Sequence, residues 1–120
     1  MRSMSYRAAR AEAKRIVALA IETHGEPKKS DDYVEVIDTI EKEAYKWRMT
    51  AAMAIMIYHT RDPRWTDKRK AAFVLAERET TSRILAELEP MVEELKLGFR
   101  EAVATWFKKY GHRKSRKVAT

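Results

Sequence analysis

The chain has 120 residues, of which 36% are charged, and it contains three Gly, three Pro and no Cys. That length suits one domain with its own core, and the lack of Cys excludes disulfides, thiolate catalysis and Cys-ligated zinc or iron–sulfur sites. The formal net charge of +7 favours an acidic partner, and no apolar run approaches the ~20 residues that a membrane-spanning helix requires.

The first predicted helix spans residues 5–24 and ends at Gly25, a residue type typical of helix C-termini. Its apolar face, read from the 3.6-residue period, holds Tyr6, Ala9, Ala13, Ile16, Val17 and Ala20. The opposite side carries Arg7, Arg10 and Lys14, with Arg15 beside them. This basic stripe is either a partner-binding surface or an ordinary solvated helix face.

The pattern of residues 30–60 predicts one long helix. A helical run of about 28 residues is about 42 Å long. Ser30, Asp31 and Asp32 offer N-cap oxygens and negative charge at the positive end of the helix dipole. The core-facing seam of this helix holds Tyr33, Ile37, Ile40, Ala44, Trp47, Ala51, Ala54 and Tyr58. We expect its first half to lie in the intramolecular core.

The second half of that helix, from Met49 to Tyr58, is apolar almost all round. Such a segment is either buried on several sides or packed at a subunit interface, and the remaining helices are too few to cover it on every side. Because Lys46, Arg48 and Arg61 flank the segment, we expect a partner subunit to pack there beside nucleic acid.

A third helix is predicted to begin at Pro63, in the first helical position, with Asp62 as its cap. It continues to about Leu88, and the polar stretch 77–83 (ERETTSR) interrupts its apolar stripe without an evident reason. Pro90 is expected to break or kink the helix because it removes one backbone hydrogen bond. A kink is favoured, since Glu89 is a poor N-cap.

A last helical segment follows Pro90 and is expected to stop at Gly111. Its apolar seam holds Leu88, Met91, Val92, Leu95, Phe99, Ala102, Val103, Trp106 and Tyr110. The sequence therefore predicts an all-α protein, a helical bundle of about four helices with a long central helix. Residues 1–110 would form a single helical domain, and residues 111–120 a basic C-terminal tail.

No combination of nucleophile, base and orienting group stands out, so we expect no enzyme, no cofactor, no metal and no small-molecule substrate. His24 and His59 fall in the last turns of predicted helices, where an imidazole interacts favourably with the helix dipole. That structural role is favoured over metal binding for both residues.

Positive and negative charges alternate in blocks along the chain. Residues 1–20, 46–70 and 102–120 carry net charges of +4, +5 and +6, whereas residues 21–45 and 71–101 carry −5 and −3. Such segregation would place cations on a polyanion, although charge pairing on helix surfaces gives a similar pattern. The candidate nucleic-acid-binding residues are Arg7, Arg10, Lys14, Arg15, Lys46, Arg48, Arg61, Arg64, Lys68, Arg69, Lys108, Lys109, Arg113, Lys114, Arg116 and Lys117.

These cations predict phosphate contacts that are independent of sequence, because no helix-turn-helix, zinc finger or ribbon motif is evident. Trp106, Phe107 and Tyr110 accompany the last basic block, and a core role is favoured for them over base stacking. Whether the polyanion is DNA or RNA stays open at this point.

The chain also lacks Asn and Gln, which together with absent Cys is typical of proteins that withstand high temperature. A small, basic, helical chain with cationic ends, a long apolar central helix and an amide-free composition resembles the major coat proteins of filamentous viruses that infect hyperthermophilic archaea. The resemblance implies dimerisation with the same or a related coat subunit, and polymerisation into a helical filament around double-stranded DNA held in the A form. It also implies location in the virion, or otherwise in the host cytoplasm. No motif assigns individual residues to the DNA.

Two other classes of protein fit the same residues. A chromatin-like or regulatory DNA-binding protein of a hyperthermophile would share the charge pattern but stay a discrete dimer. A helical protein–protein interaction module would use its charges for stability alone and bind nucleic acid weakly.

Overall fold

The computed structural model describes residues 2–60 and 63–119, with side chains described as far as Gly111. The described chain forms three helices, α1 (Tyr6–His24), α2 (Ser30–Tyr58) and α3 (Asp67–Ala119), and contains no strand. The all-α expectation is confirmed. The expected number of about four helices is not confirmed, because α3 runs on through Pro90, where a kink was favoured over a break, and through Gly111, where a stop was predicted.

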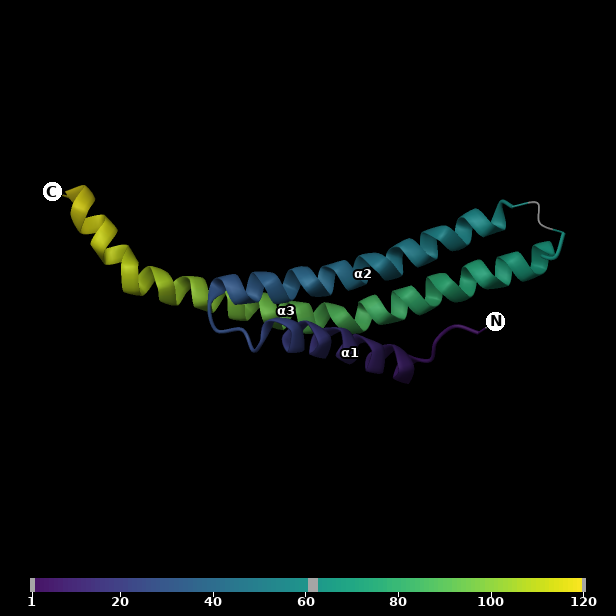
Figure 1. The fold of residues 1–120 in the computed structure, drawn as a ribbon, viewed down its shortest axis with the longest axis horizontal. Coiled ribbons are helices and arrows are strands. Elements are labelled where there is room, and N and C mark those ends of the chain that lie inside the picture. Colours follow the sequence, from purple (N-terminus) through teal and green to yellow (C-terminus); the bar gives the residue numbers. More distant parts are fainter. Residues whose placement is uncertain (1, 61–62, 120) are drawn as a thin grey trace.

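The helices form an elongated molecule (Figure 1). Helices α2 and α3 make a long antiparallel hairpin, and α1 lies alongside its middle. The extents are 76 × 28 × 20 Å and the radius of gyration is 20.8 Å, against about 14 Å for a compact domain of this length. Helix α1 packs on α2 and α3 in the middle of the rod, α2 and α3 pair without α1 at the hairpin end, and α3 projects at the C-terminal end.

The core lies where the three helices meet. Helix α1 contributes Ala9, Ala13, Ile16 and Ala20, all fully buried, against Val36, Ile40 and Ala44 of α2 and Ile84, Leu88 and Val92 of α3. Alanine at three of the four α1 positions lets the helices approach closely. Burial of each Ile or Leu contributes about 1.5–3 kcal/mol to the free energy of folding. The predicted seams of α1 and α2 are largely confirmed in this region. Val36 was missed, and Tyr6 and Tyr58 are exposed.

The ends of α1 follow from its sequence. The Ser5 hydroxyl oxygen accepts a hydrogen bond from the Ala8 amide at 3.1 Å, so Ser5 is the N-cap. Gly25 ends the helix with a φ of +81°, a conformation that any side chain would strain. The predicted stop at Gly25 is confirmed.

Of the three predicted capping residues Ser30, Asp31 and Asp32, it is Asp32 that holds the N-terminus of α2. The N-cap is Lys29, and the Asp32 carboxylate accepts hydrogen bonds from the backbone amides of Lys29 at 3.0 Å and Lys28 at 3.1 Å. These two bonds, that of Lys29 first, hold the pKa of Asp32 below its usual range. The Asp32 carboxylate thus binds the backbone amides of two residues that precede the helix. Ser30 lies inside the first turn and does not bind them.

The predicted start of α3 at Pro63 is wrong. Residues 63–65 form a turn, and α3 begins at Asp67, where the Thr66 hydroxyl accepts from the Arg69 amide at 3.2 Å. Thr66 is a good N-cap, so it sets the start. The buried Lys70 side chain donates to the Thr60 carbonyl, which ties the end of α2 to the first turn of α3. Asp62, the predicted cap, lies outside the described residues.

Helix α3 neither breaks at Pro90 nor stops at Gly111. Leu88 and Val92, on either side of the proline, are both buried against α1 and α2. This packing offsets the roughly 3 kcal/mol that an interior proline costs. The expected basic tail is not confirmed as a separate segment, since the helix continues from Gly111 to Ala119.

The polar stretch 77–83 of α3 fastens the N-terminal segment. The Thr80 hydroxyl accepts from the Met4 amide at 2.8 Å, and Arg83 donates to the Met4 carbonyl at 2.8 Å. The Ser3 hydroxyl donates to Glu79 at 2.5 Å. Thr81 is also buried and donates to the Trp47 carbonyl of α2 at 3.3 Å. The interruption of the apolar stripe thus has a structural reason: it provides the polar partners of a chain segment that is not helical.

Candidate nucleic-acid interface

The outer face of α1 is the most uniformly cationic surface among the described residues. At 100° per residue, Arg7, Arg10 and Lys14 lie on the side of the helix opposite the buried Ile16. All three are exposed and make no ion pair with the described residues, and the exposed Ala11 and Ala18 lie beside them. Arg7 and Lys14 are two turns apart, about 10.5 Å along the axis.

Arg15 differs from its three neighbours because its charge is already paired. Its guanidinium contacts the Glu12 carboxylate at 2.6 Å, on the flank of α1 and not on its outer face. This hydrogen bond is the main reason that the pKa of Glu12 lies below its usual range. Glu12 is the only acid between Tyr6 and Ile21, so its pairing with Arg15 leaves the outer face of α1 without negative charge over these residues.

The two predicted cations of α2 have acidic surroundings. Lys46 forms an ion pair with Glu43 at 2.9 Å. Arg48 lines a groove of about 460 Å³ between α2 and α3, together with Glu41, Glu89 and Glu93. These carboxylates weaken both positions as phosphate contacts, because a polyanion would have to approach them as well.

Another group of cations lies at the hairpin end. Arg64, Lys68 and Arg69 are exposed there, and the Arg69 guanidinium stacks over the Trp65 ring at 4.8 Å. Trp65 in turn meets Phe73 edge-on at 5.5 Å. Arg61, predicted to belong to this group, lies outside the described residues.

The last basic group lies on the projecting part of α3. Lys108 and Lys109 are exposed, and Trp106, Phe107 and Tyr110 are exposed beside them, so the expectation that these aromatics belong to the core is wrong. Among the described residues, only the first turn of α2 and the connection before it reach this part of α3, which leaves the three aromatics exposed. The remaining candidates, Arg113, Lys114, Arg116 and Lys117, belong to α3 but their side chains lie outside the described ones.

Sequence reasoning missed two cations that the fold brings to this end. Lys28 and Lys29, from the α1–α2 connection, line a groove of about 640 Å³ together with Trp106, Lys109 and Tyr110 of α3. Asp31 also lines this groove. The two lysines lie in a block of sequence that is acidic overall, and no local pattern indicates a role for them. Only the fold, which brings them close to α3, shows that they belong to this cationic group.

The predicted cations therefore do not form one patch. The α1 face lies beside the middle of the rod, and the hairpin-end and C-terminal groups lie at its opposite ends (Figure 1). A ligand that touched all three groups would have to be long, or the chain would have to act in several copies.

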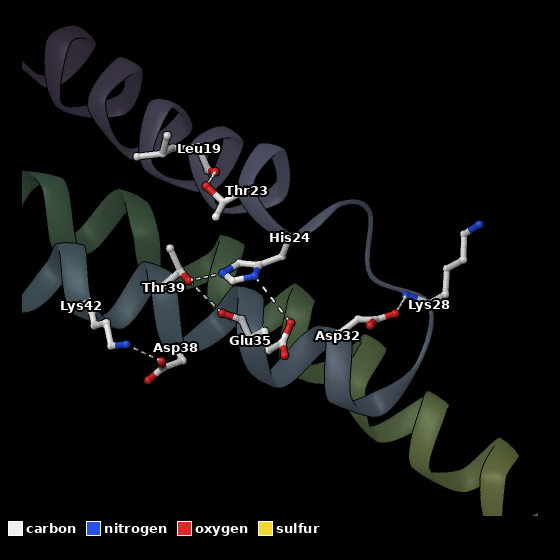
Figure 2. A network of polar contacts seen from close by, with 9 residues as sticks. All are labelled: Leu19, Thr23, His24, Lys28, Asp32, Glu35, Asp38, Thr39 and Lys42. Carbon is white, nitrogen blue, oxygen red and sulfur yellow. Dashed lines mark hydrogen bonds and ion pairs between the residues drawn. The ribbon is translucent and has the colours of Figure 1, made fainter.

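The end of α1 is fastened to α2 by His24. Figure 2 shows its ring between Thr39 and Glu35, with Nε2 2.7 Å from the Thr39 hydroxyl and Nδ1 3.5 Å from the Glu35 carboxylate. The Thr39 hydroxyl donates to the Glu35 carbonyl at 3.0 Å, so its oxygen accepts from Nε2. His24 is the last residue of α1, as predicted, and His59 follows the end of α2. The His24 contacts orient α1, and hence its cationic face, on the hairpin.

Comparison with protein-family models, curated proteins and solved structures finds no match for this chain. Within the described ranges, none of the helices has the length and apolar character needed to cross a membrane.

Proposed function

We propose that this chain is a structural nucleocapsid protein that dimerises and polymerises around double-stranded DNA in a filamentous virion. It would bind the phosphate backbone without reading sequence and would hold the duplex in the A form. The observation that carries this proposal is the outer face of α1, where Arg7, Arg10 and Lys14 have no acidic neighbour on the same side. Unpaired cations on a rigid helix fit a regular polyanion and lose no partner when they bind it.

The shape of the molecule supports a role in assembly. A rod of 76 Å, with only two helices at one end and one at the other, leaves apolar side chains uncovered at both ends. Monomeric proteins rarely expose such surfaces, which are typical of subunit contacts. An enzyme is not proposed, because the grooves hold no arrangement of groups suited to catalysis.

The DNA contact is tested by replacing Arg7, Arg10 and Lys14 together with Ala and titrating a labelled duplex at several salt concentrations. We expect the magnitude of the slope of log K against log salt to fall by about 0.9 for each phosphate that the variant no longer neutralises. Affinity near 0.1 M salt should fall of the order of tenfold for each such phosphate, equally for unrelated sequences.

A matched control removes the same charge from cations that are already paired. Lys42, Lys46 and Lys96 contact Asp38, Glu43 and Glu93, and their joint replacement with Ala should change the slope much less. If the two triple variants bind alike, net charge alone drives binding and the α1 face is not the contact surface. Wild-type affinity that does not change with salt would contradict phosphate neutralisation altogether.

The uncovered apolar ends also favour a second function, that of a helical protein–protein interaction module. Such a protein would associate without DNA and bind the duplex weakly. Electron microscopy of the protein with and without DNA separates the two functions, because only the coat protein should form filaments that contain DNA.

A further inference from the structure

An apolar strip runs along the back of α2. Its members, spaced four, three and four residues apart, are Tyr45, Met49, Ala52 and Met56, with Met53 beside them. All five are exposed, and the four larger side chains are between 41% and 70% accessible. We call these five residues the methionine strip.

The fold cannot cover the methionine strip. At 100° per residue its centre lies on the side of α2 opposite Val36, Ile40 and Ala54, which are buried. Helix α1 packs on the flank that carries Thr39, beside the first half of α2. No other described element reaches the back of the helix at the hairpin end.

Charges set the limits of the strip. Upstream on the same side, Asp38 and Lys42 form an ion pair at 3.0 Å, and downstream no charged residue occurs between Met49 and Thr60. Lys46 and Arg48 lie on the flanks of the strip in its first turn, but from Met49 to Thr60 an acidic or basic partner would find no charge to pair with. The surface therefore suits an apolar helix of similar length.

The exposed area of the chain calls for a substantial partner. The accessible surface is 9288 Å², whereas a compact monomer of 14.0 kDa exposes about 6,700 Å². The excess, of the order of 2,600 Å², exceeds the roughly 800 Å² per partner of a standard interface. A dimer could bury a strip of this size and still leave area for further assembly.

The spacing of the strip fits a second copy of the chain as the partner. Steps of four, three and four read the same in both directions, so two antiparallel strips align along their whole length. Tyr45 then meets Met56 of the second copy, and Met49 meets Ala52, whose small side chain lets the helices approach. Contacts between Met sulfur and an aromatic ring are favourable, and a two-fold interface requires a surface that complements itself.

We propose that two copies of the chain pair through the methionine strip, with their α2 helices antiparallel about a two-fold axis between Met49 and Ala52. This inference names the subunit contact of the proposed assembly, and it rests on the proposed function only in that a coat protein must self-associate. The pairing of the two chains is measured without DNA. The dimer proposal can therefore be contradicted while DNA binding is confirmed, and DNA binding can be contradicted while the dimer is confirmed.

The first test is the mass of the full-length protein in solution, measured by sedimentation or light scattering. Wild-type protein should be a dimer or larger at micromolar concentrations. Replacing Met49 and Met53 with Lys should weaken association by at least roughly a hundredfold, since two charges would be buried without partners. The matched control is Leu97→Lys, on an exposed apolar side chain of α3, which should leave the dimer intact.

The second test uses the absence of Cys from the natural chain. In Ala52→Cys each introduced thiol lies about 2 Å, measured along α2, from the two-fold axis. The two thiols are then within disulfide reach of each other, so mild oxidation should link two chains. In Asp38→Cys, on the same side of α2, the thiols lie about 19 Å from the axis and should not link. Helicity by circular dichroism checks that every variant folds.

Three outcomes would overturn the proposal. They are a monomeric wild-type protein, a Met49→Lys/Met53→Lys variant that is folded and dimeric, and equal cross-linking of the two Cys variants.

Discussion

Single hydroxyl and carboxylate groups decide where the segments outside the helices lie. Residues 77–83 stood out in the sequence only as a defect in an apolar stripe. Their partners are backbone groups of Met4 and Trp47, far away in the sequence, and no local pattern reveals them. Asp32 could be recognised as part of an N-terminal signal, but which of three neighbouring polar residues would bind the amides depended on where the helix began.

Thr80→Val should loosen the N-terminal segment. Val has nearly the same shape as Thr, but it cannot accept the hydrogen bond from the Met4 amide, which stays partly buried. We expect a loss of about 1–3 kcal/mol in the free energy of unfolding and faster hydrogen exchange at Met4. Thr105→Val is the control, because that exposed hydroxyl bonds only within its own helix and the change should stay within about 0.5 kcal/mol. Equal exchange at Met4 in both variants would show that the bond does not hold the segment.

Asp32→Asn should lower stability at neutral pH and leave it almost unchanged in acid. The pKa of Asp32 is lower in the folded chain than its usual value, so its stabilisation is present above the usual value and disappears as the pH falls through the folded pKa. Thermal unfolding curves of wild type and variant should therefore diverge at pH 7 and converge near pH 2. Asp31→Asn, which removes the same charge from a carboxylate that binds no amide in the described structure, should have a smaller effect. Curves that stay equally far apart across the pH range would contradict the linkage.

At the scale of helices, periodicity predicted α1, α2 and their core faces well. Where three helices pack together, the residues that recur on one face of each helix are the ones that become buried. It failed in α3. Pro90 and Gly111 are breakers in an isolated helix, but packing around Leu88 and Val92 keeps the backbone helical at Pro90. The seam predicted through Trp106 and Tyr110 also failed, since among the described helices only the first turn of α2 reaches it and both side chains stay exposed.

Gly98 tests how closely α2 approaches α3. A Cβ added at this position would lie 2.6 Å from Cε1 of Tyr33, so Gly98→Ala should lose stability, by about 1 kcal/mol or more, although Ala is the better helix former. At Gly111 an added Cβ meets, among the described side chains, only Phe107, at 3.9 Å, and Gly111→Ala should stabilise the protein by up to about 1 kcal/mol.

A double variant separates the clash from the propensity of the helix. In a Tyr33→Ala background, Gly98→Ala should become neutral or stabilising, measured by denaturant unfolding. If Gly98→Ala is equally harmful with and without the Tyr33 ring, the close approach is not the cause.

For the molecule as a whole, the sequence indicated both the cationic blocks and a segment of α2 that would lack cover, but not their arrangement. Charge counts along a chain cannot tell that the basic groups separate to the middle and the two ends of a rod, because that depends on the length of an uninterrupted α3. The same length explains why Lys28 and Lys29 join Lys109 at one groove, which no nearby residues could predict.

The 76 Å length also sets a stoichiometry. A B-form duplex carries one negative charge for about every 1.7 Å of its axis, so a segment as long as the rod carries about 45, and the shorter A form carries more. With a net charge of +7 per chain, at least about six copies are needed to neutralise it. A coat built from this protein would therefore surround each such length of DNA with several overlapping subunits, and the number of chains per turn would be governed by charge as much as by shape.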